Sequence, residues 1–262
     1  MDDYIACCAT DIGTARTVNQ DAVSIKVLQK GEKTSYMAIV CDGVGGLSEG
    51  EYASRCMRER LERWFLYEYP QIAQEEAKTV IPERLRKTVE LQNRLLYEHG
   101  LEKKSRCATT VSALLLEQGR YYIVHVGDSR IYRLNGEVEQ LTEDQTLIAW
   151  KVRHKLMTEE EAKTAPGQNV ITQCVGAEKG VEILLYQGDT GGQQSFLACT
   201  DGFYHRLRAD ELLDSFWKKD YQSAPELGAE LEQVIRQLKN RGERDNISIA
   251  AICRRTEWDE YQ

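Results

Sequence analysis

The stretch that decides the fold is YMAIVCDG, residues 36–43, an apolar run that ends at Asp42. Two more apolar runs are bounded by an aspartate in the same way. SFLACTDG (195–202) runs into Asp201, and DNISIAAIC (245–253) opens with Asp245. Strand ends that converge on one carboxylate cluster can build an oxygen-only site for hard divalent cations. If the three aspartates meet in space, the sequence predicts a metal-dependent hydrolase.

An Asp-Gly pair also has a plainer reading, because it is a common hairpin turn. One isolated pair would favour that reading. Here the pairs Asp42-Gly43 and Asp201-Gly202 follow matching apolar runs, and Asp245 opens a third run. The repetition shifts the balance toward a shared site for Mg²⁺ or Mn²⁺, which prefer octahedral oxygen ligands.

The composition is that of a globular protein, with 262 residues of which 42% are hydrophobic and 29% charged. The net charge of −8 argues against a nucleic-acid surface, since a phosphate backbone would be repelled. None of the eight cysteines forms a CxxC pair, so no zinc pattern is present. The N-terminus, MDDYIACC, lacks a signal-peptide core, and no apolar run approaches the roughly 20 residues needed to cross a bilayer. We therefore expect a cytoplasmic protein with no membrane partner.

Apolar runs and amphipathic stretches alternate along the chain and predict an α+β fold. We expect strands near 4–10, 22–28, 35–41, 108–117, 120–126, 130–134, 182–187, 194–199 and 247–253. Helices are expected from Ser48 with Glu51 as a capping box, from Pro82 in a first turn, and from Ser223 with Glu226 as a second box. The helix at Pro82 is expected to bury Leu85, Val89, Leu95 and Leu96.

About ten strands are too many for one open sheet, so we expect two antiparallel sheets packed as a sandwich with helix pairs on both outer faces. No stretch has the composition of a linker. The sequence therefore predicts a single domain over 1–255 with a polar insert at about 145–169, and a short tail at 256–262.

Five motifs occur in a fixed order along nearly the whole chain. They are TDIGTARTVNQDAV (10–23), VCDGVGGLSEGEYAS (40–54), CATTVSALLL (107–116) with VHVGDSRIYRL (124–134) and QLTEDQTL (140–147), LACTDGF (197–203) and RDNISI (244–249). This arrangement resembles the metal-dependent protein serine/threonine phosphatases of the protein phosphatase 2C family, in their compact prokaryotic form. The family fold is an α-β-β-α sandwich, in agreement with the layout inferred above.

The resemblance implies roles for individual residues. Asp42 would bridge two core cations, Mn²⁺ or Mg²⁺, and the Gly43 carbonyl would bind one of them. Asp201 and Asp245 would complete the shell of the other cation. The remaining implied positions are Asp21 for metal-bound waters, Asp128 for a weaker third metal, and Arg16 for the substrate phosphate.

The implied chemistry is in-line attack on phosphoserine or phosphothreonine by a hydroxide that bridges the two cations. Each residue also has an alternative. Arg16 could be a surface arginine, Asp128 could cap a turn or pair with Arg130, and Asp21 could belong to a turn. Asn246 is expected to bond a nearby loop and not a metal.

Three positions depart from the family pattern. Gln20, in the second shell of the site, replaces a common acid and could weaken the second metal. Val44 stands where some relatives place a histidine proposed as general acid, and Gln145 stands where another histidine is common. Among the chain's own histidines, His125 is expected in the core, and His99, His154 and His205 at surface or loop positions. No histidine is assigned a catalytic role.

The insert at 145–169 corresponds to the family's flap, and its charged composition suggests a substrate-selecting surface. Phosphorylated proteins, substrates of a Ser/Thr kinase, are the expected partners, and a monomer is the default. A sensor-type hydrolase of a stress pathway is a substrate question within this reading. The alternative function is a pseudophosphatase, a regulatory binding module without turnover, for which Gln20 is the main support.

Overall fold

The computed structural model describes residues 4–44, 49–162, 164–167, 169–191 and 194–255. These residues form two antiparallel sheets, with strand orders β1-β10-β9-β6-β7 and β2-β3-β4-β5-β8. The strands are β1 (Tyr4–Asp11), β2 (Asp21–Lys30), β3 (Lys33–Asp42), β4 (Val111–Glu117), β5 (Arg120–Val126), β6 (Arg130–Leu134), β7 (Val138–Gln140), β8 (Leu184–Asp189), β9 (Ser195–Cys199) and β10 (Ile247–Arg254). The predicted sandwich is confirmed.

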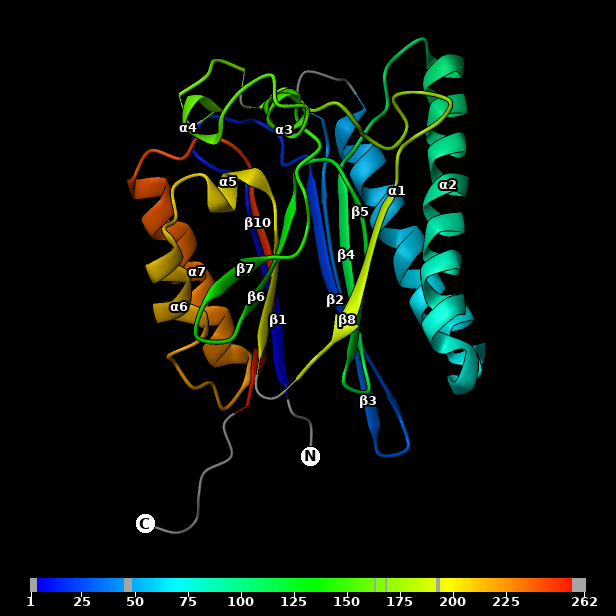
Figure 1. Cartoon of the computed structure of the whole chain (residues 1–262), viewed down its shortest axis with the longest axis vertical. Helices are drawn as coiled ribbons and strands as arrows, with labels where there is room; N and C mark the ends of the chain where they lie inside the picture. The colour runs from blue at the N-terminus through cyan, green and yellow to red at the C-terminus, as the bar shows by residue number, and fades with distance from the viewer. Residues whose placement is uncertain (1–3, 45–48, 163, 168, 192–193, 256–262) are drawn as a thin grey trace.

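Helices cover both outer faces of the sandwich (Figure 1). Beside β2–β5 lie α1 (Gly50–Arg63) and α2 (Ala77–Lys103), joined by a π-helical turn η1 (Trp64–Glu68) and the 3-10 turns η2 (Tyr69–Gln71) and η3 (Gln74–Glu76). Beside the other sheet lie α5 (Asp201–Tyr204), α6 (Ala209–Phe216) and α7 (Ala224–Asn240). At one end of the sandwich, α3 (Leu147–Arg153) and α4 (Glu159–Ala162) belong to the predicted insert.

Strand β3 shows why the deciding stretch is apolar at every position. Tyr36, Ala38 and Val40 pack between the two sheets. Met37, Ile39 and Cys41 point the other way and pack under α1 and α2. A strand covered on both faces reads as a continuous apolar run, because successive side chains alternate between the faces.

Several local predictions were wrong. Helix α2 begins at Ala77, so Pro82 lies inside it and not in its first turn. Leu95 is 49% exposed, while its neighbour Leu96 is buried. The sequence pattern also missed β7, α5 and α6, which are short elements with little periodicity of their own.

The two predicted capping boxes have different outcomes. Helix α1 has Glu49 at its N-cap, and Ser48 lies outside the described residues. Ser223 is the N-cap of α7, but its side chain makes no capping bond. Glu226 accepts its hydrogen bond from the backbone N–H of Gln222 instead, at 2.8 Å.

The tail at 256–262 also lies outside the described residues. Within the described part of the chain, no helix combines the length and apolarity that a membrane span needs.

Candidate active site

The first two aspartates face each other at the end of a strand pair. Asp21 opens β2, Asp42 closes β3, and the antiparallel register sets them opposite one another. The backbone of Asp42 is held by the two residues that precede β4, because Thr110 Oγ1 accepts from the Asp42 N–H at 2.9 Å and Thr109 Oγ1 donates to the Asp42 carbonyl at 2.9 Å. Asp21 Oδ2 accepts from Thr200 Oγ1 at 2.8 Å, while its buried Oδ1 has no hydrogen-bond partner.

Gly43 and Gln20 lie against this pair. The Gly43 N–H donates to the Gln20 carbonyl at 3.0 Å, and a Cβ at Gly43 would come within 2.4 Å of the Gly50 carbonyl oxygen. Ser54 of α1 also donates to the Gln20 carbonyl, at 2.6 Å. Gln20 therefore joins the start of β2 to β3 and α1 through its backbone, so its place in the fold does not depend on an acidic side chain.

The other two core aspartates come from the opposite sheet. Asp201 is the first residue of α5, directly after β9, and Asp245 lies just before β10. Both Asp245 oxygens accept hydrogen bonds from Arg16, from Nε and from Nη2, each at 2.7 Å. Arg16, whose side chain is 43% exposed, is thus an exposed arginine that is paired with Asp245.

Asp128 follows β5 and is 4% exposed. The alternative pairing with Arg130 is not found. Arg130 pairs with Asp144 instead, with 2.6 Å between Arg130 Nη2 and Asp144 Oδ2. Asp128 Oδ1 is buried and has no hydrogen-bond partner. A buried carboxylate oxygen without a donor is costly, so a cation at this position would satisfy it.

Burial and mutual repulsion set the protonation of these groups. Burial, with a further contribution from Asp201, raises the pKa of both Asp21 and Asp128 to about 7. Burial and the charge of Asp21 raise the pKa of Asp42 well above its ordinary value. Burial also acts on Asp245, but hydrogen bonds from Arg16 and the Asn246 N–H outweigh it and lower that pKa. The carboxylates of the site therefore carry more negative charge than the neighbouring cationic side chains balance.

The residues present fit divalent cations in their chemistry. The candidate ligands are carboxylates and a carbonyl, which hard cations prefer. Two buried carboxylate oxygens, Asp21 Oδ1 and Asp128 Oδ1, accept no hydrogen bond within the described residues. Among the described residues, no three His, Cys, Asp or Glu side chains stand in an arrangement that could hold a metal ion as they are placed in this structure. One visible difference from such an arrangement is that Arg16 takes both oxygens of Asp245.

Asn246 fixes the loop that carries Arg16, as predicted. Its Nδ2 donates to the carbonyls of Ile12 at 2.9 Å and Val18 at 3.2 Å. Its Oδ1 accepts from the Gln20 N–H at 2.8 Å. Asn246 is therefore a positioning residue and not a ligand.

The histidine predictions hold for His125, which is fully buried between Ser112 Oγ at 2.7 Å and the Glu143 carbonyl at 3.0 Å. His205 is partly exposed, as predicted, but it also lies beside one of the aspartates of the site. Its Nδ1 lies 3.9 Å from Asp201 Oδ2, one helical turn further along the chain. The i, i+4 spacing from Asp201 was the available signal, and it was missed because no helix was expected there.

Gln145 also has a structural role. Its Oε1 accepts from the Gly127 N–H at 2.8 Å, and its Nε2 donates to the Glu182 carbonyl at 3.1 Å. It therefore ties the start of the insert to the turn that carries Asp128.

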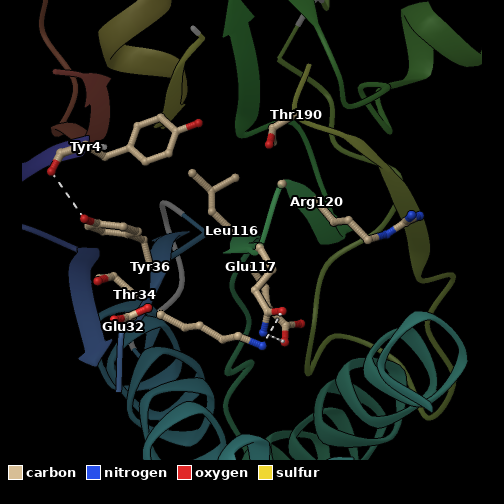
Figure 2. Close-up of a pocket in the computed structure, with 11 residues that line it drawn as sticks. Tyr4, Glu32, Thr34, Tyr36, Leu116, Glu117, Arg120 and Thr190 are labelled. Carbon is tan, nitrogen blue, oxygen red and sulfur yellow. Dashed lines mark hydrogen bonds between the residues drawn. The ribbon is translucent and has the colours of Figure 1, made fainter. Parts of the chain in front are cut away.

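A separate cavity of about 220 Å³ lies at the other end of the strands (Figure 2). It is lined by the start of β1, the β2–β3 turn and the β4–β5 turn, including Tyr4, Tyr36 and Arg120. The carboxylates stand at the opposite ends of β1, β2 and β3, some ten residues or about 30 Å away along a strand. This cavity therefore has no part in the chemistry of the aspartates.

The chain is similar to known proteins over most of its length. The family model described as protein phosphatase 2C matches residues 14–246. A putative protein phosphatase 2C-type from Streptococcus pyogenes serotype M6 is 30% identical over 251 residues, which are 95% of this chain and 96% of the relative.

Solved structures are also similar. Serine/threonine phosphatase Stp1 from Staphylococcus aureus is 26% identical, with a TM-score of 0.81, over 96% of this chain and 95% of Stp1. The catalytic domain of the phosphatase PstP, solved with 2 manganese ions, is 23% identical, with a TM-score of 0.74 over 97% of this chain and 99% of PstP. The likeness to PstP is one of fold.

Proposed function

The chain belongs to the protein phosphatase 2C family of metal-dependent serine/threonine phosphatases, and from that premise we propose how its own residues carry out the hydrolysis of phosphoserine and phosphothreonine. The single observation that carries the proposal is the gathering of Asp21, Asp42, Asp201 and Asp245 at one end of the sandwich. The relatives are named as phosphatases, which gives the pseudophosphatase alternative no support.

We assign the core cations to Asp42, the Gly43 carbonyl, Asp201 and Asp245, with Asp21 holding coordinated waters. We assign a weaker third cation to Asp128, and the buried Oδ1 without a hydrogen-bond partner supports that assignment. When bound, two divalent cations lower the pKa of a water toward neutrality and so supply the nucleophile. Mn²⁺ is the first cation to test, because the PstP structure contains manganese.

Arg16 has two anionic partners in this proposal. In the present structure its fork binds Asp245. A guanidinium binds a phosphate in the same two-point geometry. With Asp245 holding a cation, Arg16 would be available to the substrate phosphate, where it would orient the group for in-line attack and stabilise the charge that develops on it.

The insert at 145–169 is proposed as a substrate-selecting flap of a single phosphatase domain over 1–255. Two observations support it: α3 and α4 lie at the carboxylate end of the sandwich (Figure 1), and Gln145 ties the insert to the Asp128 turn. Deleting part of the flap is expected to change phosphopeptide preference.

We further propose a cytoplasmic monomer that acts on the products of a Ser/Thr kinase. All eight cysteines are free thiols in the structure, which suits a reducing compartment.

The test is hydrolysis of a phosphothreonine peptide by purified protein across a Mn²⁺ titration, with a chelator and Asp42→Asn as controls. Phosphate release should require the cation and should be lost in the variant. If folded protein released no phosphate at millimolar Mn²⁺, the proposed function would be wrong, and Gln20 would become the first residue to examine.

A further inference from the structure

An open groove of about 730 Å³ lies directly beside the carboxylates. It is formed by the loop of Arg16, the end of the insert, the chain after α5 and the chain before β10. Its charged and polar lining residues are Arg16, Asn169, His205, Arg206, Glu243, Arg244 and Asp245. The groove therefore continues from the proposed phosphate position onto a surface that carries two further arginines.

Both acids that line the groove already have partners within the protein, Asp245 in Arg16 and Glu243 in Arg206. The Glu243 side chain is 7% exposed, and its Oε1 accepts the backbone N–H groups of Arg244 at 2.7 Å and Asp245 at 3.0 Å. Its Oε2 lies 3.4 Å from Arg206 Nε. Glu243 thus fixes the backbone of Arg244 and the position of Arg206.

The two arginines differ in their own contacts. Arg206 is 46% exposed and meets Glu243 through Nε. Arg244 is exposed, and within the described residues its guanidinium has no ion pair or hydrogen bond, although its neighbour Asp245 is paired with Arg16. An exposed arginine held by its backbone, beside the reacting centre, is suited to bind an anion from outside the protein.

We propose that Arg206 and Arg244 form a substrate subsite that binds an anionic side chain close in sequence to the phosphorylated residue. The proposal rests on the proposed function, because it places the phosphorylated residue at the aspartates. The Ala15 N–H donates to the Arg244 carbonyl at 3.3 Å, so Arg244 adjoins the loop of Arg16, and the anion belongs to a residue that flanks the phosphothreonine. A carboxylate and a second phosphate offer the same chemistry to a guanidinium fork.

The test compares phosphothreonine peptides that differ only at the flanking positions, which carry glutamate, alanine, lysine or a phosphonate analogue of phosphoserine that cannot be hydrolysed. The protein is assayed with Mn²⁺ as wild type, Arg206→Gln, Arg244→Gln and Arg244→Glu. Glutamine keeps a donor for Glu243 while removing the charge. Arg236→Ala is the matched control, since Arg236 is 64% exposed on α7 and outside the groove. p-Nitrophenyl phosphate, which has no flanking residues, normalises each variant.

The wild type should favour the glutamate peptide over the alanine peptide in kcat/KM by roughly fivefold, and the lysine peptide should be the poorest. Each glutamine variant should bring that ratio close to one, Arg244→Glu should favour the lysine peptide, and Arg236→Ala should keep the wild-type ratio. A preference confined to the phosphonate peptide and lost in the same variants would identify a second phosphate as the natural anion.

Two results would overturn the subsite. One is equal kcat/KM for all peptides while p-nitrophenyl phosphate is hydrolysed. The other is an acidic preference that survives in both glutamine variants. Absence of hydrolysis of every substrate, p-nitrophenyl phosphate included, would instead refute the proposed function on which the subsite rests.

Discussion

Asn246→Ala removes the clamp on the loop that carries Arg16, without removing a charged group. The variant loses the bonds to the Ile12 carbonyl, the Val18 carbonyl and the Gln20 N–H. At about 1 kcal/mol for each bond, the free energy of unfolding should fall by about 3 kcal/mol. The backbone N–H at position 246, which donates to Asp245 Oδ1 at 2.9 Å, is unchanged by the substitution.

The catalytic consequence follows from the position of Arg16 on that loop. A guanidinium displaced by about 1 Å no longer matches two phosphate oxygens, so kcat/KM for a phosphothreonine peptide should fall at least about tenfold. The loss should appear mainly in KM, because the role proposed for Arg16 is to bind the phosphate and not to activate the nucleophile. Urea unfolding gives the stability, and initial rates with Mn²⁺ give the two kinetic constants.

Asn93→Ala is a matched control for this prediction. Asn93 is also buried and also makes three hydrogen bonds, from the Gly176 N–H at 2.7 Å and to the carbonyls of Glu178 at 3.1 Å and Lys179 at 3.2 Å. It lies on α2, away from the Arg16 loop. The two variants should lose similar stability, but only Asn246→Ala should lose activity in the folded protein. An equal loss of activity in both would refute the positioning role of Asn246.

Three further predictions concern the metal ligands, the phosphate contact and pH. Asp201→Asn should lower kcat at least about a hundredfold, and near-normal turnover with metal still bound would contradict the two-metal assignment. Arg16→Ala should mainly raise KM, and a fall in kcat alone would contradict a phosphate-binding role. Burial lowers the pKa of His125 to about 4, so the unfolded chain binds the extra proton and stability falls from about pH 6.5 to 4, by up to about 3 kcal/mol. Urea midpoints of His125→Gln should depend less on pH across that window, and an unchanged slope would refute the assignment.

The parts of the fold that the sequence predicts are those set by local pattern. The apolar run of β3 predicts a buried strand, because both faces of that strand are covered. The Asp42-Gly43 pair that follows predicts the end of the strand. Pro82 misled because a proline six residues into a helix loses one backbone bond, and the packing of Ile81 and Leu85 outweighs that loss. Leu95 misled because helical spacing gives a stripe of residues but not the width of the buried face.

The site required contacts that no local pattern contains. Arg16 and Asp245 are 229 residues apart, yet they form the closest ion pair of the carboxylate cluster. The family motif predicted both residues but not their pairing. In the same way, the position of His205 beside Asp201 depends on α5, a four-residue helix too short to show a period.

Under the proposed function, the pairing of Arg16 with Asp245 would link metal binding to substrate binding. Among the described residues, Asp245 is the carboxylate of this cluster whose pKa is lowered, and Arg16 is the reason. A cation that takes over Asp245 removes the main partner of Arg16 and leaves its fork available for phosphate. The reverse also holds, because phosphate that draws Arg16 away exposes Asp245 to the cation. Each ligand should therefore raise the affinity for the other by the same factor, as thermodynamic linkage requires.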